Sequence, residues 1–319
     1  MAIRTVKPHR LGILAALLAE VVLLTILTSS FGGKEFFDST FLSWSNLKDV
    51  LRELSFVAIM AVGQSMVIIS GGIDLSVGSV LGLSGVMSAI ALNGNLSVFS
   101  SVLIGLLVGL VSGLMNGFLI TKAKLPPFIA TLGMMSIARG LAYTITGGET
   151  IRNLPPQFLM IGQGEIFIIP IPIIIMVVLA LIARYALKST TWGRYVYAIG
   201  GNEEAAIYSG VNVEMIKIFV YSLCGFSAGL AGVLFTSRFG VGQSTAGNGY
   251  ELDVIAAAVI GGISLSGGRG TITGAIIGAV FMGILRNGLI LLSVSSYWQQ
   301  FAIGLVIILA VVLDRMTKR

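Results

Sequence analysis

The sequence is poor in the residues that most often build catalytic and metal sites. Among its 319 residues it has one cysteine, Cys224, and one histidine, His9. A single cysteine excludes an internal disulfide and a metal site built from several cysteines. A single histidine in a basic N-terminal stretch excludes a multi-histidine metal site and a histidine relay. No clustered constellation is left for a membrane-embedded enzyme, so we expect a protein that is not a catalyst.

A phosphate-binding loop is also absent. The pattern Gly-x-x-x-x-Gly-Lys-Ser/Thr, whose backbone amides cradle nucleotide phosphates, occurs nowhere in the chain. The protein therefore cannot hydrolyse ATP by that machinery. If it moves a solute uphill, the energy comes from a partner or from an ion gradient.

Charged residues are scarce as well. They make up 11% of the chain, compared with about 25% in soluble proteins, whereas 55% of the residues are hydrophobic and the mean hydropathy is +0.97. This composition indicates an integral membrane protein with no room for a large soluble domain. The net charge of +6 is explained by basic loops that orient the chain in lipid, and we expect no nucleic-acid partner.

Ten apolar stretches approach the roughly 20 residues that a membrane helix needs. They lie at residues 11–31, 55–70, 76–92, 97–121, 127–147, 165–187, 218–238, 253–264, 272–294 and 298–313. The first is interpreted as an uncleaved helix rather than a signal peptide. The stretch 253–264 is too short for a straight crossing, so we expect it to be broken or tilted. The distribution of Lys and Arg in short loops places both termini in the cytoplasm.

Glycine is abundant and follows two patterns. Along the fourth and ninth stretches it recurs every four residues, which predicts smooth helix faces for close packing. The positions are Gly105, Gly109, Gly113, Gly117, Gly274 and Gly278.

Two further glycine-rich runs interrupt the apolar stretches. Residues 71–78 read Gly-Gly-Ile-Asp-Leu-Ser-Val-Gly, and residues 261–268 nearly repeat them. Such runs are stable at membrane depth only where protein or water forms hydrogen bonds with their backbone amides. A pair of glycine-interrupted apolar segments in the two halves of a chain indicates a transport pathway. Two alternatives remain. The runs can be static turns instead of moving parts of a pathway, and their similarity can be a coincidence instead of an internal duplication. The candidate pathway or gate residues here are Gly72, Asp74, Ser76, Gly78, Gly262, Ser264, Ser266 and Gly268.

Polar residues at membrane depth are functional candidates. Asp74 either caps the next helix by accepting amides near residues 76–78, which is the favoured interpretation, or lines the pathway. Arg139 and Arg286 each need a buried partner or a wet cavity, and Glu20 is a conceivable partner for one of them. Three uncharged residues are candidates for pathway lining or for helix–helix bonding: Gln64, Asn116 and Asn287.

The longest connection on the cytoplasmic side, residues 188–217, contains a predicted two-turn helix. Asn202 is a plausible N-cap, acidic residues favour the first turn, and Gly210 is a fitting stop. Such a helix is unstable alone and needs a docking surface, either its own membrane domain or the groove of a partner. The candidate coupling residues are Gly200, Gly201, Asn202, Glu203, Glu204, Ala205, Ala206, Ser209 and Gly210, with a small apolar face at Ala205, Ala206 and Ser209.

Three separated motifs resemble the ribose-type ABC sugar permease family. They are residues 72–79, residues 193–213, and residues 249–257 followed by 261–268, and the similarity extends from about Asn46 to Leu313. The resemblance implies a second permease subunit, ATP-binding cassette subunits that bind ATP and Mg²⁺ on the cytoplasmic face, and an extracytoplasmic sugar-binding protein. It also implies that residues 200–210 couple the permease to the ATPase.

We therefore expect an all-α polytopic permease with about ten transmembrane helices, forming a single domain over residues 1–319 in a bacterial inner membrane. It imports a monosaccharide such as ribose or a related small polar molecule, along a pathway between two permease subunits. The alternative is a secondary transporter driven by an ion gradient, for which Asp74 and Glu20 supply too few titratable groups.

Overall fold

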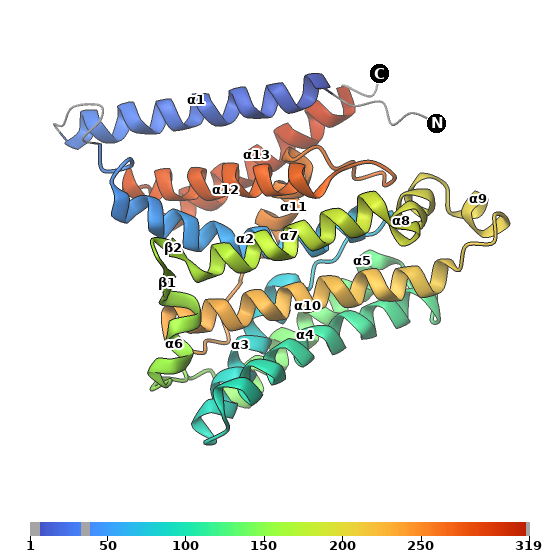
Figure 1. The fold of residues 1–319 in the computed structure, drawn as a ribbon, viewed down its shortest axis with the longest axis horizontal. Helices are drawn as coiled ribbons and strands as arrows, with labels where there is room; N and C mark the ends of the chain where they lie inside the picture. Colours follow the sequence, from blue (N-terminus) through green and yellow to red (C-terminus); the bar gives the residue numbers. More distant parts are fainter. Residues whose placement is uncertain (1–6, 33–38, 317–319) are drawn as a thin grey trace.

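The computed structural model describes residues 7–32 and 39–316, which are mostly helical as predicted (Figure 1). The helices are α1 (Lys7–Gly32), α2 (Trp44–Ile69), α3 (Val77–Asn93), α4 (Val98–Thr121), α5 (Pro127–Thr146), α6 (Pro156–Gln163), α7 (Ile171–Ser189), α8 (Thr191–Gly201), α9 (Glu203–Tyr208), α10 (Val213–Phe239), α11 (Tyr250–Ile260), α12 (Ile272–Leu291) and α13 (Ser296–Met316). Strands β1 (Glu165–Ile166) and β2 (Ile169–Pro170) form an antiparallel hairpin.

Six of the described helices are long and apolar enough to cross a membrane, namely α2, α4, α5, α7, α10 and α12. Each coincides with one of the predicted stretches. Helix α11 has only 11 residues, which at 1.5 Å per residue gives about 16 Å, roughly half of a hydrocarbon core. The stretch expected at 253–264 is thus shifted to Tyr250–Ile260 and is too short for a straight crossing.

The predicted stretch 165–187 was wrong at its start. Its first residues form the β1–β2 hairpin, and helix α7 begins only at Ile171. Residues 166–169 are all apolar, so their composition gave no indication that a membrane helix would not include them. Pro172, in contrast, favours the first helical turn, where the N–H that proline lacks would have no partner.

Helices α2 and α10 form the centre of the molecule. Helix α2 is almost entirely buried, and α10 packs along α4 through small residues. A Cβ added to Gly109 would lie 2.7 Å from the Cα of Gly229, and one added to Gly113 would lie 3.0 Å from the Cα of Gly225. The predicted smooth face of α4 is confirmed, because any larger residue would force these two helices apart.

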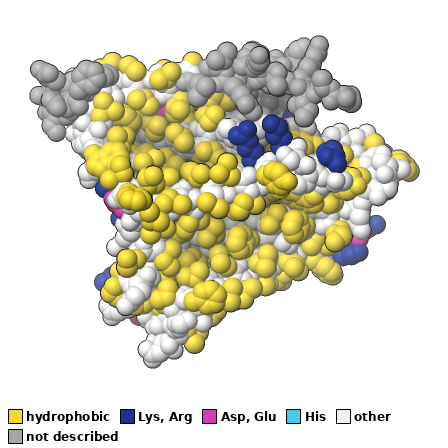
Figure 2. Space-filling view, in the orientation of Figure 1, with side chains coloured by type: hydrophobic (Ala, Val, Ile, Leu, Met, Phe, Trp, Pro, Cys, Tyr) yellow, Lys and Arg dark blue, Asp and Glu magenta, His cyan; other side chains and the backbone are white. Residues whose placement is uncertain are grey.

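The two ends of the helix bundle carry different elements. The hairpin and α6 lie at one end, and α8 and α9 lie at the other, beside the first residues of α1 and the last turns of α13 (Figure 1). Between the ends, apolar side chains cover most of the visible face (Figure 2). Helix α4 exposes large apolar side chains such as Leu107, Leu114 and Phe118, which suits contact with lipid.

Candidate functional site

The first glycine loop (residues 70–76) connects α2 to α3 and is organised by a buried aspartate. The Asp74 side chain is fully buried, and its Oδ1 accepts hydrogen bonds from the N–H of Ser76 at 2.8 Å and from the Ser76 hydroxyl at 2.6 Å. Both bonds go to Ser76, the residue that precedes α3, so Asp74 orders the entry into this helix. Its roles as a helix cap and as a gate both stay predictions.

Two side chains from neighbouring helices hold this aspartate. Asn116 of α4 donates to the Ser76 hydroxyl at 3.0 Å and to Asp74 Oδ2 at 3.4 Å. Gln64 of α2, with its amide oriented to satisfy its partners, accepts the Asp74 N–H at 3.1 Å and donates to the Asp74 carbonyl at 3.2 Å. Both amides are fully buried and bond the loop to its helices in this conformation. Their part in the pathway is untested.

Two glycines of the first motif allow close approaches. A Cβ at Gly72 would collide with the Tyr221 hydroxyl group, and one at Gly78 would collide with the Gly247 carbonyl and the Glu251 carboxylate. Sequence reasoning did not single out Tyr221, which lies in the apolar stretch of α10 and carries no motif. Its spacing of three residues from Cys224 places both on one helix face, where Cys224 is also buried, as expected.

The second glycine loop (residues 261–271) connects α11 to α12 and is folded onto itself. The N–H of Ser264 donates to the Arg269 carbonyl at 3.1 Å, and the N–H of Gly267 donates to the Ser264 carbonyl at 2.9 Å. Gly262 and Gly268 have φ values of +82° and +69°, which side chains other than glycine rarely adopt. Ser266 is exposed at the tip of this loop.

The second glycine loop contacts the end of α2, at the residue that leads into the first loop. The N–H of Gly268 donates to the carbonyl of Ile69, the last residue of α2, at 2.8 Å. The end of α8 lies against the same point, because a Cβ at Gly200 would lie 2.6 Å from the Gly268 nitrogen. The sequence predicted both loops and the coupling segment separately, and the structure brings all three together.

The coupling segment (residues 188–217) contains two helices rather than one. Helix α8 was not expected, whereas α9 begins at the predicted cap, where Asn202 Oδ1 accepts the Ala205 N–H at 2.9 Å. Of the three residues of the predicted apolar face, Ala206 is buried against Ile199 and Val213, whereas Ala205 and Ser209 are exposed. Docking of this face on a partner stays a prediction. The other coupling candidates on α9 are exposed, and Glu203 pairs with Lys217 at 2.7 Å.

The two arginines predicted inside helices have partners that the sequence could not assign. Arg139 Nη1 donates to the carbonyls of Ser244 and Ala246 at 2.5 and 2.8 Å. Arg286 pairs with Asp253 at 2.5 Å. Glu20 is therefore not the partner of either arginine, and its carboxylate oxygens have no hydrogen bond to the described part of the chain.

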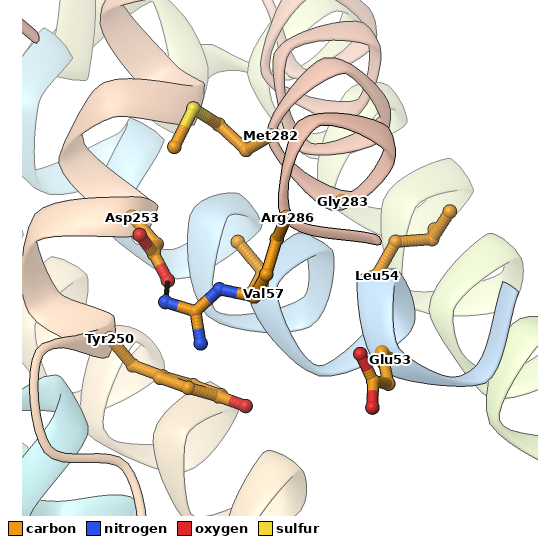
Figure 3. Close-up of a pocket in the computed structure, with 8 residues that line it drawn as sticks. All are labelled: Glu53, Leu54, Val57, Tyr250, Asp253, Met282, Gly283 and Arg286. Atoms are coloured by element: carbon orange, nitrogen blue, oxygen red, sulfur yellow. Dashed lines mark hydrogen bonds and ion pairs between the residues drawn. The ribbon is translucent and has the colours of Figure 1, made fainter. Parts of the chain in front are cut away.

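The Arg286–Asp253 pair lies where α2, α11 and α12 meet (Figure 3). The guanidinium group of Arg286 stands 5.2 Å from the ring centre of Tyr250, and Glu53 of α2 faces the same small cavity of about 20 Å³. This space is enough for one water molecule. The sequence offered one signal for this pair, namely an acidic residue, Asp253, near the start of the short helix α11 and an arginine, Arg286, in the following helix α12.

Asn287, the remaining polar candidate, pairs with Asn46 at the start of α2. Each amide donates to the other, at 2.8 and 3.0 Å. The structure thus places Asn287 in helix–helix bonding, one of the two alternatives open for it. Among the described residues, no group of three His, Cys, Asp or Glu side chains is arranged to hold a metal ion.

The long apolar helices, the buried glycine loops and the exposed coupling segment together define a polytopic membrane protein built as a permease. The chain belongs to the family described as "Branched-chain amino acid transport system / permease component", which matches residues 46–311.

Similar proteins cover nearly the whole chain. It is 45% identical over 309 residues to the ribose import permease protein RbsC of Bacillus subtilis, covering 96% of this chain and 93% of that protein. Identity to RbsC of Escherichia coli K12 is 43% over 303 residues, or 94% and 92% of the two chains. The L-arabinose transport system permease protein AraH of the same strain is 39% identical over 283 residues, or 89% and 86%. No solved structure matches the chain.

Proposed function

We propose that this chain is the membrane-spanning permease subunit of an ATP-driven ABC importer for a monosaccharide, with ribose as the first candidate. One observation carries the proposal: the chain is 43–45% identical to ribose import permeases, and in it the end of α8, which leads into the exposed helix α9, lies against both the end of α2 and the second glycine loop. The family description names branched-chain amino acids, but the similar full-length relatives are named for sugars, which favours a sugar.

The proposed assembly has three kinds of component. Two permease subunits, identical or paralogous, enclose the pathway between them. ATP-binding cassette subunits bind ATP and Mg²⁺ and dock on α9, and an extracytoplasmic binding protein delivers the sugar at the opposite end. The exposed residues of α9 support the docking site, because a six-residue helix held by one buried alanine has most of its surface free.

The proposed topology has about ten membrane segments in a bacterial inner membrane, with both termini in the cytoplasm. Its support is the arrangement of the ends, since α8, α9, the start of α1 and the end of α13 lie at the same end of the molecule (Figure 1). Lys188, Arg194 and Lys217, which the sequence places in the cytoplasm, belong to the coupling segment, which runs from the end of α7 to the start of α10 at this end. An ion-gradient mechanism has no comparable support, because the Asp74 carboxylate already accepts three hydrogen bonds from Ser76 and Asn116.

The test is the ATPase activity of the purified components. We expect none from this chain alone. The complex with its cassette subunits should hydrolyse ATP faster when the binding protein carries ribose than when it is empty. Binding proteins loaded with L-arabinose or D-allose provide the specificity control. Equal hydrolysis with empty and with loaded binding proteins for all three sugars would contradict the proposal.

A further inference from the structure

The end of helix α8 is enclosed by backbone from the end of α2 and from the second glycine loop. A Cβ at Gly200 would lie 2.9 Å from the carbonyl carbon of Ile69 and 2.6 Å from the nitrogen of Gly268, and one at Gly267 would lie 2.6 Å from the Gly200 carbonyl oxygen. We call these four residues, Ile69, Gly200, Gly267 and Gly268, the glycine junction. No side chain separates the three segments here.

We infer that the glycine junction passes movement of the coupling segment into both glycine loops, and that Gly200 and Tyr197 are the positioning residues of this transmission. The inference rests on the proposed function and adds the route by which docking of a cassette subunit reaches the membrane interior. Backbone in direct contact has no flexible side chain to absorb a shift, so displacement of one segment displaces the others.

Hydrogen bonds reinforce the contact. Gly268 donates to the Ile69 carbonyl at 2.8 Å, which joins the second loop to the end of α2. The Tyr197 hydroxyl of α8 donates to the Gly270 carbonyl at 2.8 Å. This bond joins α8 to the second loop, and Tyr197 lies three residues before Gly200 in the same helix. A movement of α8 therefore pulls on the second loop directly and on the end of α2 through it.

Helix α8 is held by packing contacts, so it is suited to move as a rigid body. Its inner face is buried at Val196 and Ile199, and the Trp192 ring packs edge-on against Phe219 of α10 at 5.5 Å. Helix α9 follows immediately after Asn202, and Ile199 packs with Ala206 of α9 in one apolar cluster. The exposed helix α9 is thus linked to the glycine junction through the short, packed helix α8.

The test uses the full complex with cassette subunits and binding protein in liposomes, and measures both sugar uptake and ATP hydrolysis. Tyr197→Phe removes one neutral hydrogen bond and keeps the ring, so uptake per ATP should fall about fivefold. Gly200→Ala should lower it about tenfold, because the added Cβ would collide with the backbone of Ile69 and Gly268. Both variants should keep their cassette subunits and hydrolyse ATP.

The matched control is Gly133→Ala on α5, where an added Cβ meets nothing within 4 Å, and it should leave uptake per ATP unchanged. Unchanged uptake per ATP in Tyr197→Phe, or loss of the cassette subunits from it, would overturn the inference even if Gly200→Ala fails to fold. If the wild-type complex itself takes up no sugar with ATP, the proposed function fails instead.

Discussion

At the residue scale, the membrane interior of this protein is stabilised by polar groups that satisfy each other. Asp74, Ser76, Gln64 and Asn116 form one buried network, and Arg286 with Asp253 forms a second. Unpaired polar groups at this depth are costly, so these bonds stabilise the loop between α2 and α3 and the junction of α11 with α12. Within the described residues, Asn116 Oδ1 and Asp253 Oδ1 still have no hydrogen-bond partner.

Asp74→Asn should lower stability more than it changes the choice of sugar. The amide keeps one acceptor but loses charge-assisted bonds, which are about twice as strong as neutral ones, and we expect a loss of about 1–3 kcal/mol. Thermal unfolding of the purified variant measures this, with Glu149→Gln at an exposed position as control. Normal stability combined with failed translocation would instead assign Asp74 to the pathway or gate.

Arg286→Met should destabilise the protein because it leaves Asp253 buried without its partner. Breaking a buried pair typically costs 3–5 kcal/mol, and about 2–4 kcal/mol is expected here because Arg286 is partly exposed. The double variant Arg286→Met with Asp253→Asn should recover most of that loss. Equal melting temperatures for the single and double variants would show that the pair contributes no coupling energy.

At the scale of elements, helix α9 illustrates what local sequence determines. Its start at Asn202 followed from an N-cap side chain and acids in the first turn, and its end followed from Gly210, which has φ of +79°. The β1–β2 hairpin was missed because residues 166–169 are as apolar as a membrane helix. The Arg286–Asp253 pair was missed because it depends on the register between α11 and α12, which no local pattern encodes.

Glu203→Arg and Gly201→Trp should weaken binding of the cassette subunits without unfolding the membrane domain. The first reverses a charge favourable at the helix start, worth roughly 0.3–1 kcal/mol, and breaks the pair with Lys217. The second adds a ring at an exposed glycine, where only a partner would be obstructed. Pull-down of the cassette subunits is the measurement, with Glu149→Arg as the charge-reversal control. Wild-type pull-down and uptake for both variants would exclude this segment as the coupling element.

At the scale of the whole molecule, the account requires the glycine loops to move during transport. Ser76 is buried at 1% exposure, whereas Ser266 is exposed. Single cysteines introduced as Ser76→Cys and Ser266→Cys in a Cys224→Ala background should therefore differ in thiol labelling in the nucleotide-free state. Labelling at one or both sites should change when the complex is trapped with ATP. Equal labelling in both states at both sites would identify the loops as static turns.

The class of protein was predictable from composition and from three motifs, because a low charge content and glycine-interrupted apolar stretches already reflect the membrane. The contact between Ile69 and Gly268 was not predictable, since it joins residues in opposite halves of the chain through backbone atoms alone. Side-chain patterns carry little information about such contacts. For the same reason the roles of Gly200 and Tyr197 emerge only from the fold.

The most direct measurement of the central claim is ribose uptake into liposomes that contain this chain, its cassette subunits and the binding protein. The account predicts uptake only when ATP and Mg²⁺ reach the cassette subunits, and none from the chain alone under a proton or sodium gradient. The chain lacks its own phosphate-binding loop, so its transport depends on the partner. Uptake by this chain alone, driven by an ion gradient and without ATP, would contradict the account.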